Sequence, residues 1–74
     1  MNKNEFLMAL SEELEIDNQE LTEETYWDEI EDFSSMSILI IIAFMHENFN
    51  QKIKADQFSA MKQVKDLINM IDLN

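Results

Sequence analysis

Apolar residues recur at helical spacing near the start of the chain, with acidic residues between them. They are Phe6, Leu7, Leu10 and Leu14. This spacing places their side chains on one face of a helix, which can then pack against a core. Asn2 or Asn4 can cap the first turn, because an asparagine side chain accepts a hydrogen bond from a free backbone N–H. The pattern predicts a helix over residues 4–15.

Residues 16–34 contain few apolar positions, and no single period runs through them. The apolar residues are Ile16, Leu21, Tyr26, Trp27, Ile30 and Phe33. Thr22, followed by Glu23 and Glu24, can cap one short turn. The pattern predicts a long ordered loop that its aromatic side chains hold against the core, and a loop of this length in a small domain is usually functional.

Residues 35–49 carry an apolar stripe with spacing i, i+4, i+7 and i+11. Its members are Ile38, Ile42, Met45 and Phe49. Leu39, Ile40, Ile41 and Phe44 widen this stripe almost all round. The β-branched run would also suit a buried strand, but no turn residues or second strand accompany it. A helix over 35–49 is therefore predicted.

The last third of the chain predicts two more helices. Residues 50–55 form a polar connection with Ile53 turned inward. A short helix follows over 56–61, with Asp56 as its N-cap. A longer helix over 62–72 has apolar residues at i, i+3, i+4 and i+7, which are Val64, Leu67, Ile68 and Ile71.

Composition narrows the fold class, because the chain contains no Gly, Pro or Cys. Tight hairpins and phosphate-binding loops rely on Gly, so a sheet protein or a nucleotide-binding motif is not expected. Disulfides are impossible, and a single His leaves no His-rich metal site. We expect an all-α fold in one domain over residues 1–74. It is a small bundle of three longer helices and one short helix, with a long loop between the first two.

The net charge is −11, and no Lys or Arg lies between Lys3 and Lys52. Such a surface repels nucleic acid and anionic membranes and attracts basic proteins, although it also serves solubility alone. The longest mostly apolar run, residues 36–45, is about half of a membrane span. The N-terminal segment lacks the layout of a signal peptide. We therefore expect a cytoplasmic protein with no membrane insertion and no nucleic-acid partner.

One short motif points to a known family. Ser34-Ser35-Met36 opens the predicted helix over 35–49, and His46-Glu47-Asn48-Phe49 closes it. The chain resembles the acyl carrier proteins, whose Asp-Ser-Leu motif lies at the start of their second helix and whose Glu-Glu-Phe lies at its end. If Phe49 is the family's closing Phe, Ser35 falls on the family's modified Ser.

The likeness extends along essentially the whole chain. Leu14-Glu15-Ile16 stands where the family has Leu-Gly-Val, and Glu20-Leu21-Thr22 stands where it has Glu-Val-Thr. Gln63-Val64 stands where Thr-Val opens the fourth helix. The chain also departs from the family. Ser34 and Met36 replace the motif's Asp and Leu, and Glu31-Asp32-Phe33 replaces the Leu-Gly that precedes the motif. Residues 38–44 (ILIIIAF) carry no charge where the family presents acidic residues.

The resemblance implies a carrier in fatty acid or secondary metabolite biosynthesis, and not an enzyme. Ser35 would be the cofactor-binding residue, holding a covalent 4'-phosphopantetheine arm taken from coenzyme A. Acyl or aminoacyl cargo would travel as a thioester on that arm. The expected partners are a phosphopantetheinyl transferase and acyl- or aminoacyl-handling enzymes. No catalytic and no metal-binding residues are expected.

Other interpretations stay open. Ser34 or Ser35 can be an ordinary helix N-cap. The degenerate motif and the uncharged segment favour an acyl-carrier-like module that lacks the arm and binds a protein through the helix over 35–49. The same apolar helix can close a homodimer. An acidic mimic of nucleic acid would explain the charge but not the likeness to the carriers.

Overall fold

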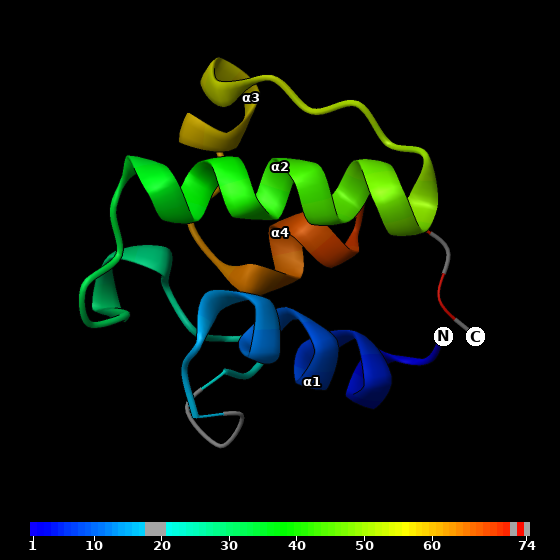
Figure 1. The fold of residues 1–74 in the computed structure, drawn as a ribbon, viewed down its shortest axis with the longest axis horizontal. Coiled ribbons are helices and arrows are strands. Elements are labelled where there is room, and N and C mark those ends of the chain that lie inside the picture. The colour runs from blue at the N-terminus through cyan, green and yellow to red at the C-terminus, as the bar shows by residue number, and fades with distance from the viewer. Residues whose placement is uncertain (18–20, 72, 74) are drawn as a thin grey trace.

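The computed structural model describes residues 1–17, 21–71 and 73. These residues form four α-helices and one 3₁₀ helix, and they contain no β-strand. The elements are α1 (Lys3–Leu14), η1 (Trp27–Glu29), α2 (Ser35–Phe49), α3 (Ala55–Ser59) and α4 (Val64–Ile68). Figure 1 shows α2 crossing the molecule with α1 below it and α3 above it. The expected all-α class is confirmed for the part of the chain that is described.

Both long helices form where the sequence predicts them. Of the two candidate caps for α1, Asn2 is the one used: its Oδ1 accepts a hydrogen bond from the Glu5 N–H at 2.8 Å. Glu5 Oε1 accepts the Asn2 N–H at 2.9 Å, which completes a capping box. α2 spans the predicted residues from Ser35 to Phe49.

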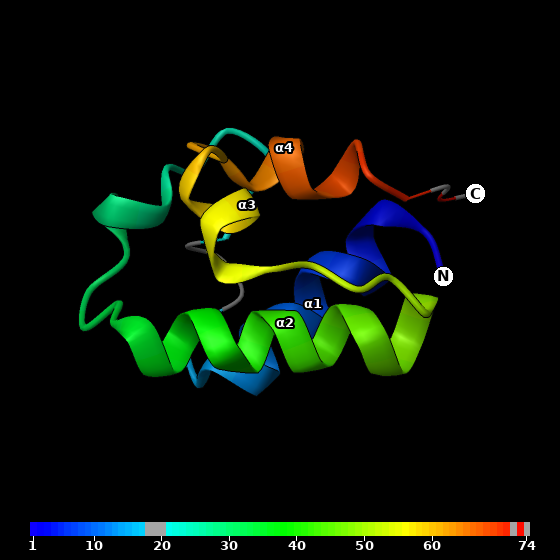
Figure 2. The ribbon, with the colours of Figure 1, turned by 90° about the horizontal axis from the view of Figure 1, so that it is seen from above.

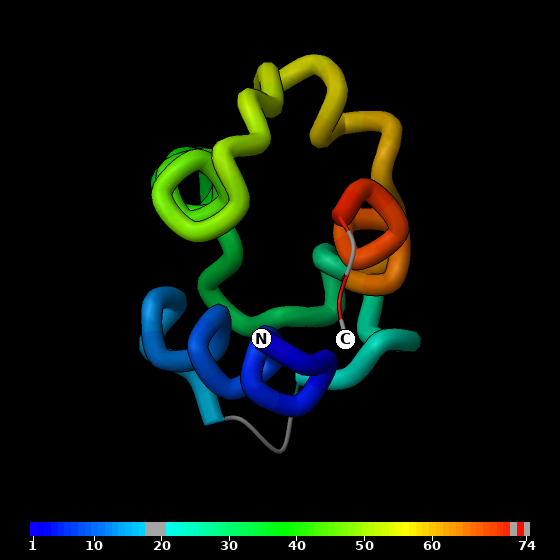
Figure 3. The backbone as a smooth tube through the Cα atoms, turned by 90° about the vertical axis from the view of Figure 1, so that its right-hand side faces the viewer, coloured from blue at the N-terminus to red at the C-terminus, as the bar shows by residue number. Residues whose placement is uncertain are grey.

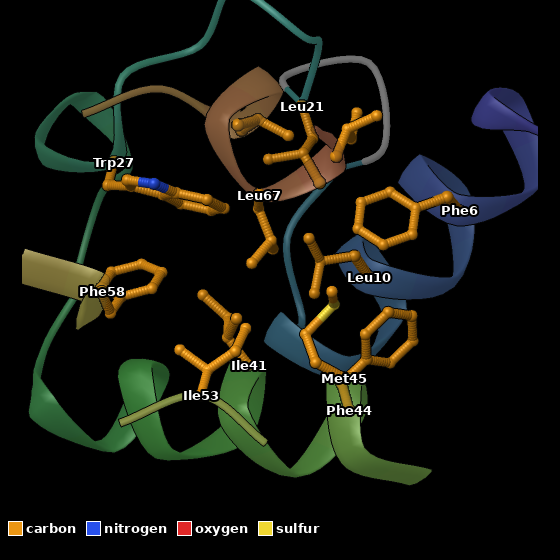
Figure 4. Close-up of a cluster of buried hydrophobic side chains, with 12 residues drawn as sticks. Phe6, Leu10, Leu21, Trp27, Ile41, Phe44, Met45, Ile53, Phe58 and Leu67 are labelled. Carbon is orange, nitrogen blue, oxygen red and sulfur yellow. The ribbon is translucent and has the colours of Figure 1, made fainter. Parts of the chain in front are cut away.

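The helices surround a common core. α1 packs against α2, and α2 packs against α3. Figure 2 shows α4 on the side of the molecule opposite α2, and Figure 3 looks along α2, with the other helices arranged around the centre. Buried side chains from every helix and from the long loop fill this centre, and Figure 4 shows them meeting.

The buried face of α2 differs from the predicted stripe. Ile41, Phe44 and Met45 are the buried residues of this helix. Of the predicted stripe only Met45 is buried, and Ile38, Ile42 and Phe49 are half-buried. The predicted stripe packs against the core but does not form the most buried face of α2, because almost every position from 38 to 45 is apolar. Helical spacing alone therefore does not select the core-facing side.

Two groups of aromatic rings hold the ends of the core. Phe6, Phe44 and Phe49 meet between α1 and the C-terminal half of α2, with ring centroids 5.6 to 6.2 Å apart. The second group joins the long loop to α3. Its Trp27 ring lies 5.8 Å from Phe33 and 5.1 Å from Phe58. The predicted role of Trp27 and Phe33 in holding the loop is thereby confirmed, whereas Tyr26 is 46% exposed.

Backbone hydrogen bonds also tie the long loop to the segment that starts α4. Trp27 N–H donates to the Lys62 carbonyl at 3.1 Å, and Val64 N–H donates to the Thr25 carbonyl at 2.9 Å. Tyr26 and Gln63 form an isolated antiparallel bridge between these bonds. The described loop residues from 21 to 34 therefore have fixed partners over much of their length, and they are ordered as predicted.

The two short helices differ from their predicted bounds. α3 spans Ala55–Ser59, and its N-cap is Lys54 rather than Asp56, which lies in the first turn. The predicted helix over 62–72 is only the five-residue α4, Val64–Ile68. The expected three longer helices are therefore two. At the N-terminal end of α4, the backbone N–H groups of Val64 and Lys65 donate to loop carbonyls. They would donate to the preceding turn if the helix began earlier.

Candidate functional site

The start of α2 is fixed by the residues immediately before it. Asp32 has a left-handed backbone with φ of 62°, which turns the chain, and the Phe33 N–H donates to the Ile30 carbonyl at 3.3 Å. Phe33 then stacks on Trp27 in the second aromatic group. Ser34 follows at the N-cap position with an extended backbone. The point where the helix begins is thus set by packing as well as by capping.

Ser35 is the first helical residue of α2, and it is exposed. Its hydroxyl makes no hydrogen bond to any described residue. The neighbouring serines have other roles: the Ser34 N–H donates to Ser37 Oγ at 3.1 Å, and Ser37 is half-buried. Of the two candidate caps, Ser34 therefore occupies the N-cap position of α2, and Ser35 is exposed at the first helical position.

Among the described residues, no side chain that could act as a general base is hydrogen-bonded to Ser35. The single His46 is exposed and lies eleven positions further along the same helix, which corresponds to about 16 Å of helix rise. A serine without a base within hydrogen-bonding distance is a weak nucleophile, so another protein would have to activate its hydroxyl. The arrangement suits a residue that is modified by a partner.

A hollow of about 560 Å³ opens beside Ser35, which we call the α2 hollow. The end of α1, the loop before α2 and the first turns of α2 form its walls. The residues that line it are Leu14, Glu15, Ile16, Asp17, Ile30, Glu31, Asp32, Phe33, Ser34, Met36, Ser37 and Ile40. Its apolar residues are half-buried or exposed, so part of their surface stays in contact with water.

Among the described residues that line this hollow none is basic, so carboxylates supply all the charge of these residues. Glu15, Asp17, Glu31 and Asp32 are exposed around it. The first backbone N–H groups of α2 contribute a partial positive charge at the same place, which favours a phosphate ester on Ser35. The site thus combines an apolar lining, an acidic rim and one helix N-terminus.

Next to the hollow, the exposed side of α2 is apolar. Met36 is 65% exposed, Leu39 is 59% exposed, and Ala43 is also exposed. These three residues follow one another at i, i+3 and i+7, so they form a continuous row, which we call the α2 ridge. Met36 belongs to both the ridge and the hollow lining. The two features therefore form one surface that begins at Met36, the residue after Ser35.

The described part of the chain holds no group of three or more His, Cys, Asp or Glu side chains arranged to bind a metal ion. Within residues 1–17, 21–71 and 73, no helix combines the length and the apolar character that a membrane crossing requires.

Sequence reasoning singled out Ser35 as the expected site and did not locate the hollow next to it. Leu14, Ile16 and Ile30 are distant in sequence from Ile40, and no local pattern indicates that they meet. The sequence contained one indication of the hollow: the loop contains a few apolar residues, which would be expected to pack against another part of the fold. Glu20 of the family likeness lies outside the described residues.

Comparisons with known proteins do not assign the chain to a family. No family model matches the sequence, and no curated protein matches it significantly. The likeness to the acyl carrier proteins therefore rests on the motif residues themselves.

Proposed function

We propose that this protein is a carrier that holds acyl or aminoacyl intermediates as thioesters on a 4'-phosphopantetheine arm at Ser35. The observation that carries this proposal is the exposed Ser35 hydroxyl, free of hydrogen bonds to the described residues, at the first position of a firmly anchored helix. A surface helix end lets a long arm swing, and the aromatic group around Phe33 keeps its root in place. The carrier itself performs no catalysis.

Attachment of the arm follows from the chemistry of the hydroxyl. A transferase supplies the base that removes the Ser35 proton, and the Oγ attacks the phosphoanhydride of coenzyme A. The new phosphodiester joins Oγ to the pantetheine half, and the nucleotide half leaves with the other phosphate. The N–H groups at the start of α2 stabilise the charge of the phosphodiester.

A measurement of intact mass tests the proposal. The chain is incubated with coenzyme A and a broad-specificity phosphopantetheinyl transferase. We expect a gain of one phosphopantetheine group, because Ser35 is accessible. The gain should be absent in Ser35→Ala and present in Ser34→Ala, which removes the adjacent exposed hydroxyl. A gain that persists in Ser35→Ala contradicts the assignment, as does no gain with several transferases.

If several transferases give no gain in mass, a second candidate function is favoured. The α2 ridge exposes Met36 and Leu39, which have no packing role in the core. An acyl-carrier-like module without the arm would use this ridge to bind a protein partner. This alternative explains the uncharged helix and the replacement of the motif's Asp by Ser34.

A further inference from the structure

We infer that Met36 is a reversible oxidation site, at which peroxide converts the thioether to a sulfoxide and thereby slows modification of the neighbouring Ser35. Three observations carry the inference: the exposure of Met36, its position in the α2 hollow, and the burial of Met45 on the same helix. The effect on Ser35 rests on the proposed function, whereas the oxidation itself does not.

Methionine is the only sulfur-containing residue of this chain, which has six Met and no Cys. Peroxide therefore meets no thiol that would react before the thioethers. Among the described residues, the exposed large apolar side chains are Met1, Met8, Tyr26, Met36 and Leu39. Three of these five are methionines, and Met36 is the most exposed of all. Much of the exposed apolar surface is therefore open to oxidation.

Burial separates the methionines of this protein into two groups. Met45 lies in the core and is fully buried, whereas Met61 and Met70 are half-buried. Oxidation follows exposure, so peroxide reaches Met36 in the folded protein and reaches Met45 only when the core opens. The same helix thus carries one reactive and one protected thioether.

The oxidation of Met36 needs only the peroxide. A lone pair of the Met36 sulfur attacks one peroxide oxygen, the O–O bond breaks as the S–O bond forms, and the other oxygen leaves as water with both hydrogens. The sulfur loses two electrons, and the peroxide gains them. The product is a polar sulfoxide in place of an apolar thioether, and methionine sulfoxide reductases reverse the change.

The fold should survive this change at Met36. The residue occupies the second position of α2 and is not part of the hydrophobic core. Its sulfoxide can therefore stay in contact with water. The stacking of Phe33 on Trp27, which holds the start of the helix, does not involve Met36.

The consequence of oxidation falls on the surface beside Ser35. Met36 follows Ser35 in the chain and lines the α2 hollow together with apolar side chains such as Leu14 and Ile40. No described lining residue has a basic side chain that could donate to a sulfoxide. An enzyme that reaches Ser35 Oγ also covers part of Met36, so it would have to remove water from a polar group that gains no new partner. The sulfoxide should therefore slow modification of Ser35.

Peptide mapping of the native full chain after peroxide treatment tests the oxidation site. Mass spectrometry follows the amount of sulfoxide at each methionine with time. We expect Met36, and Met8 on α1, which is 51% exposed, to oxidise at least about tenfold faster than Met45. Far-UV circular dichroism should stay unchanged, and the reductases should restore Met36 in the folded protein. Oxidation of Met36 no faster than that of Met45, or loss of the helical signal when Met36 is oxidised, would overturn the inference.

The rate of arm attachment, followed by intact mass after the peroxide is removed, tests the effect on Ser35. Mild oxidation should slow attachment to the wild-type chain about tenfold, and the reductases should restore the rate. Met36→Leu removes the sulfur but keeps an apolar side chain of similar size, so peroxide treatment should not slow its modification. Met8→Leu is the matched control, in which Met36 is still oxidised and attachment should slow as in the wild type. Equal slowing of the two variants would show that the effect does not come from Met36.

The two experiments separate this inference from the proposed function. If the untreated chain takes no arm, the proposed function fails and the effect on Ser35 fails with it, while peptide mapping still decides whether Met36 is an oxidation site. If the untreated chain takes the arm and oxidation of Met36 leaves the rate unchanged, the proposed function stands and the inference is overturned.

Discussion

The carboxylate of Asp66 holds the start of α4. Its Oδ2 accepts hydrogen bonds from the backbone N–H groups of Gln63, at 3.0 Å, and Lys62, at 2.9 Å. These bonds favour the charged carboxylate, and the positive charge of Lys65 adds to the effect. They outweigh a small opposing effect of desolvation and hold the pKa of Asp66 below its ordinary value.

The lowered pKa predicts how this residue affects stability as pH changes. A carboxylate whose pKa is lower in the folded state stabilises the fold above its unfolded pKa. That contribution is lost as pH falls below about 4 and through the folded pKa. Asp66→Asn keeps an acceptor oxygen but cannot titrate, so its stability should fall less steeply in this range. Chemical unfolding at several pH values measures the difference. Parallel curves for the two proteins would contradict the assignment.

Single residues also show what sequence alone could predict. Asn2 and Ser34 were each one of two cap candidates in the sequence, because the chemistry of capping is local. The sequence did not indicate that Ile41 is buried more deeply than Ile42, since both lie in a uniformly apolar run. Only contacts with α1 and α3, which come from distant parts of the chain, decide between them.

At the scale of elements, the aromatic group of Trp27, Phe33 and Phe58 connects three segments. Phe58 of α3 packs against Trp27 and Phe33 of the long loop. Because Phe33 lies just before α2, this packing also holds the first residues of that helix. The Phe6, Phe44 and Phe49 group performs a similar packing role at the other end of α2. The two groups therefore stabilise the same helix but influence different ends of it.

This division predicts a local effect of Phe58→Leu. The smaller side chain should cost about 1 to 2 kcal/mol of unfolding free energy, because it removes ring contacts and leaves a small cavity. It should also speed amide hydrogen exchange near Ser35, since Phe33 loses a neighbour. Phe49→Leu is the matched control: it should destabilise the fold while leaving exchange near Ser35 unchanged. Equal exchange rates in the two variants would show that Phe58 does not hold the start of α2.

The sequence predicted the bounds of the two long helices better than those of the two short ones. α1 and α2 repeat their apolar pattern over several turns and have recognisable caps. α3 and α4 each have five residues, so their patterns contain little more than one period. The backbone N–H groups of Val64 and Lys65 donate to loop carbonyls, so α4 does not extend further toward the N-terminus. No sequence pattern predicts these bonds, because the two partners are far apart along the chain.

At the scale of the whole molecule, charge and the candidate site are related. The acidic residues that surround the α2 hollow come from the end of α1 and from two parts of the loop, and folding brings them together near the start of α2. The total charge could be read directly from the sequence, but this concentration required the fold. Gathering so many carboxylates on a small body opposes folding, because like charges repel in the compact state.

Added salt should therefore stabilise this protein. The Lys3–Glu23 ion pair, with its Nζ and Oε1 3.2 Å apart, is exposed and contributes little that salt could weaken. Screening of the carboxylates should dominate, and we expect Tm to rise by about 5 °C between low salt and about 0.5 M NaCl. Glu13→Lys, on the exposed side of α1, should raise Tm at low salt and reduce its further rise. Thermal unfolding followed by circular dichroism measures both. If Tm falls as salt is added, attractive ion pairs outweigh the repulsion, and the acidic surface is then part of what holds the fold together.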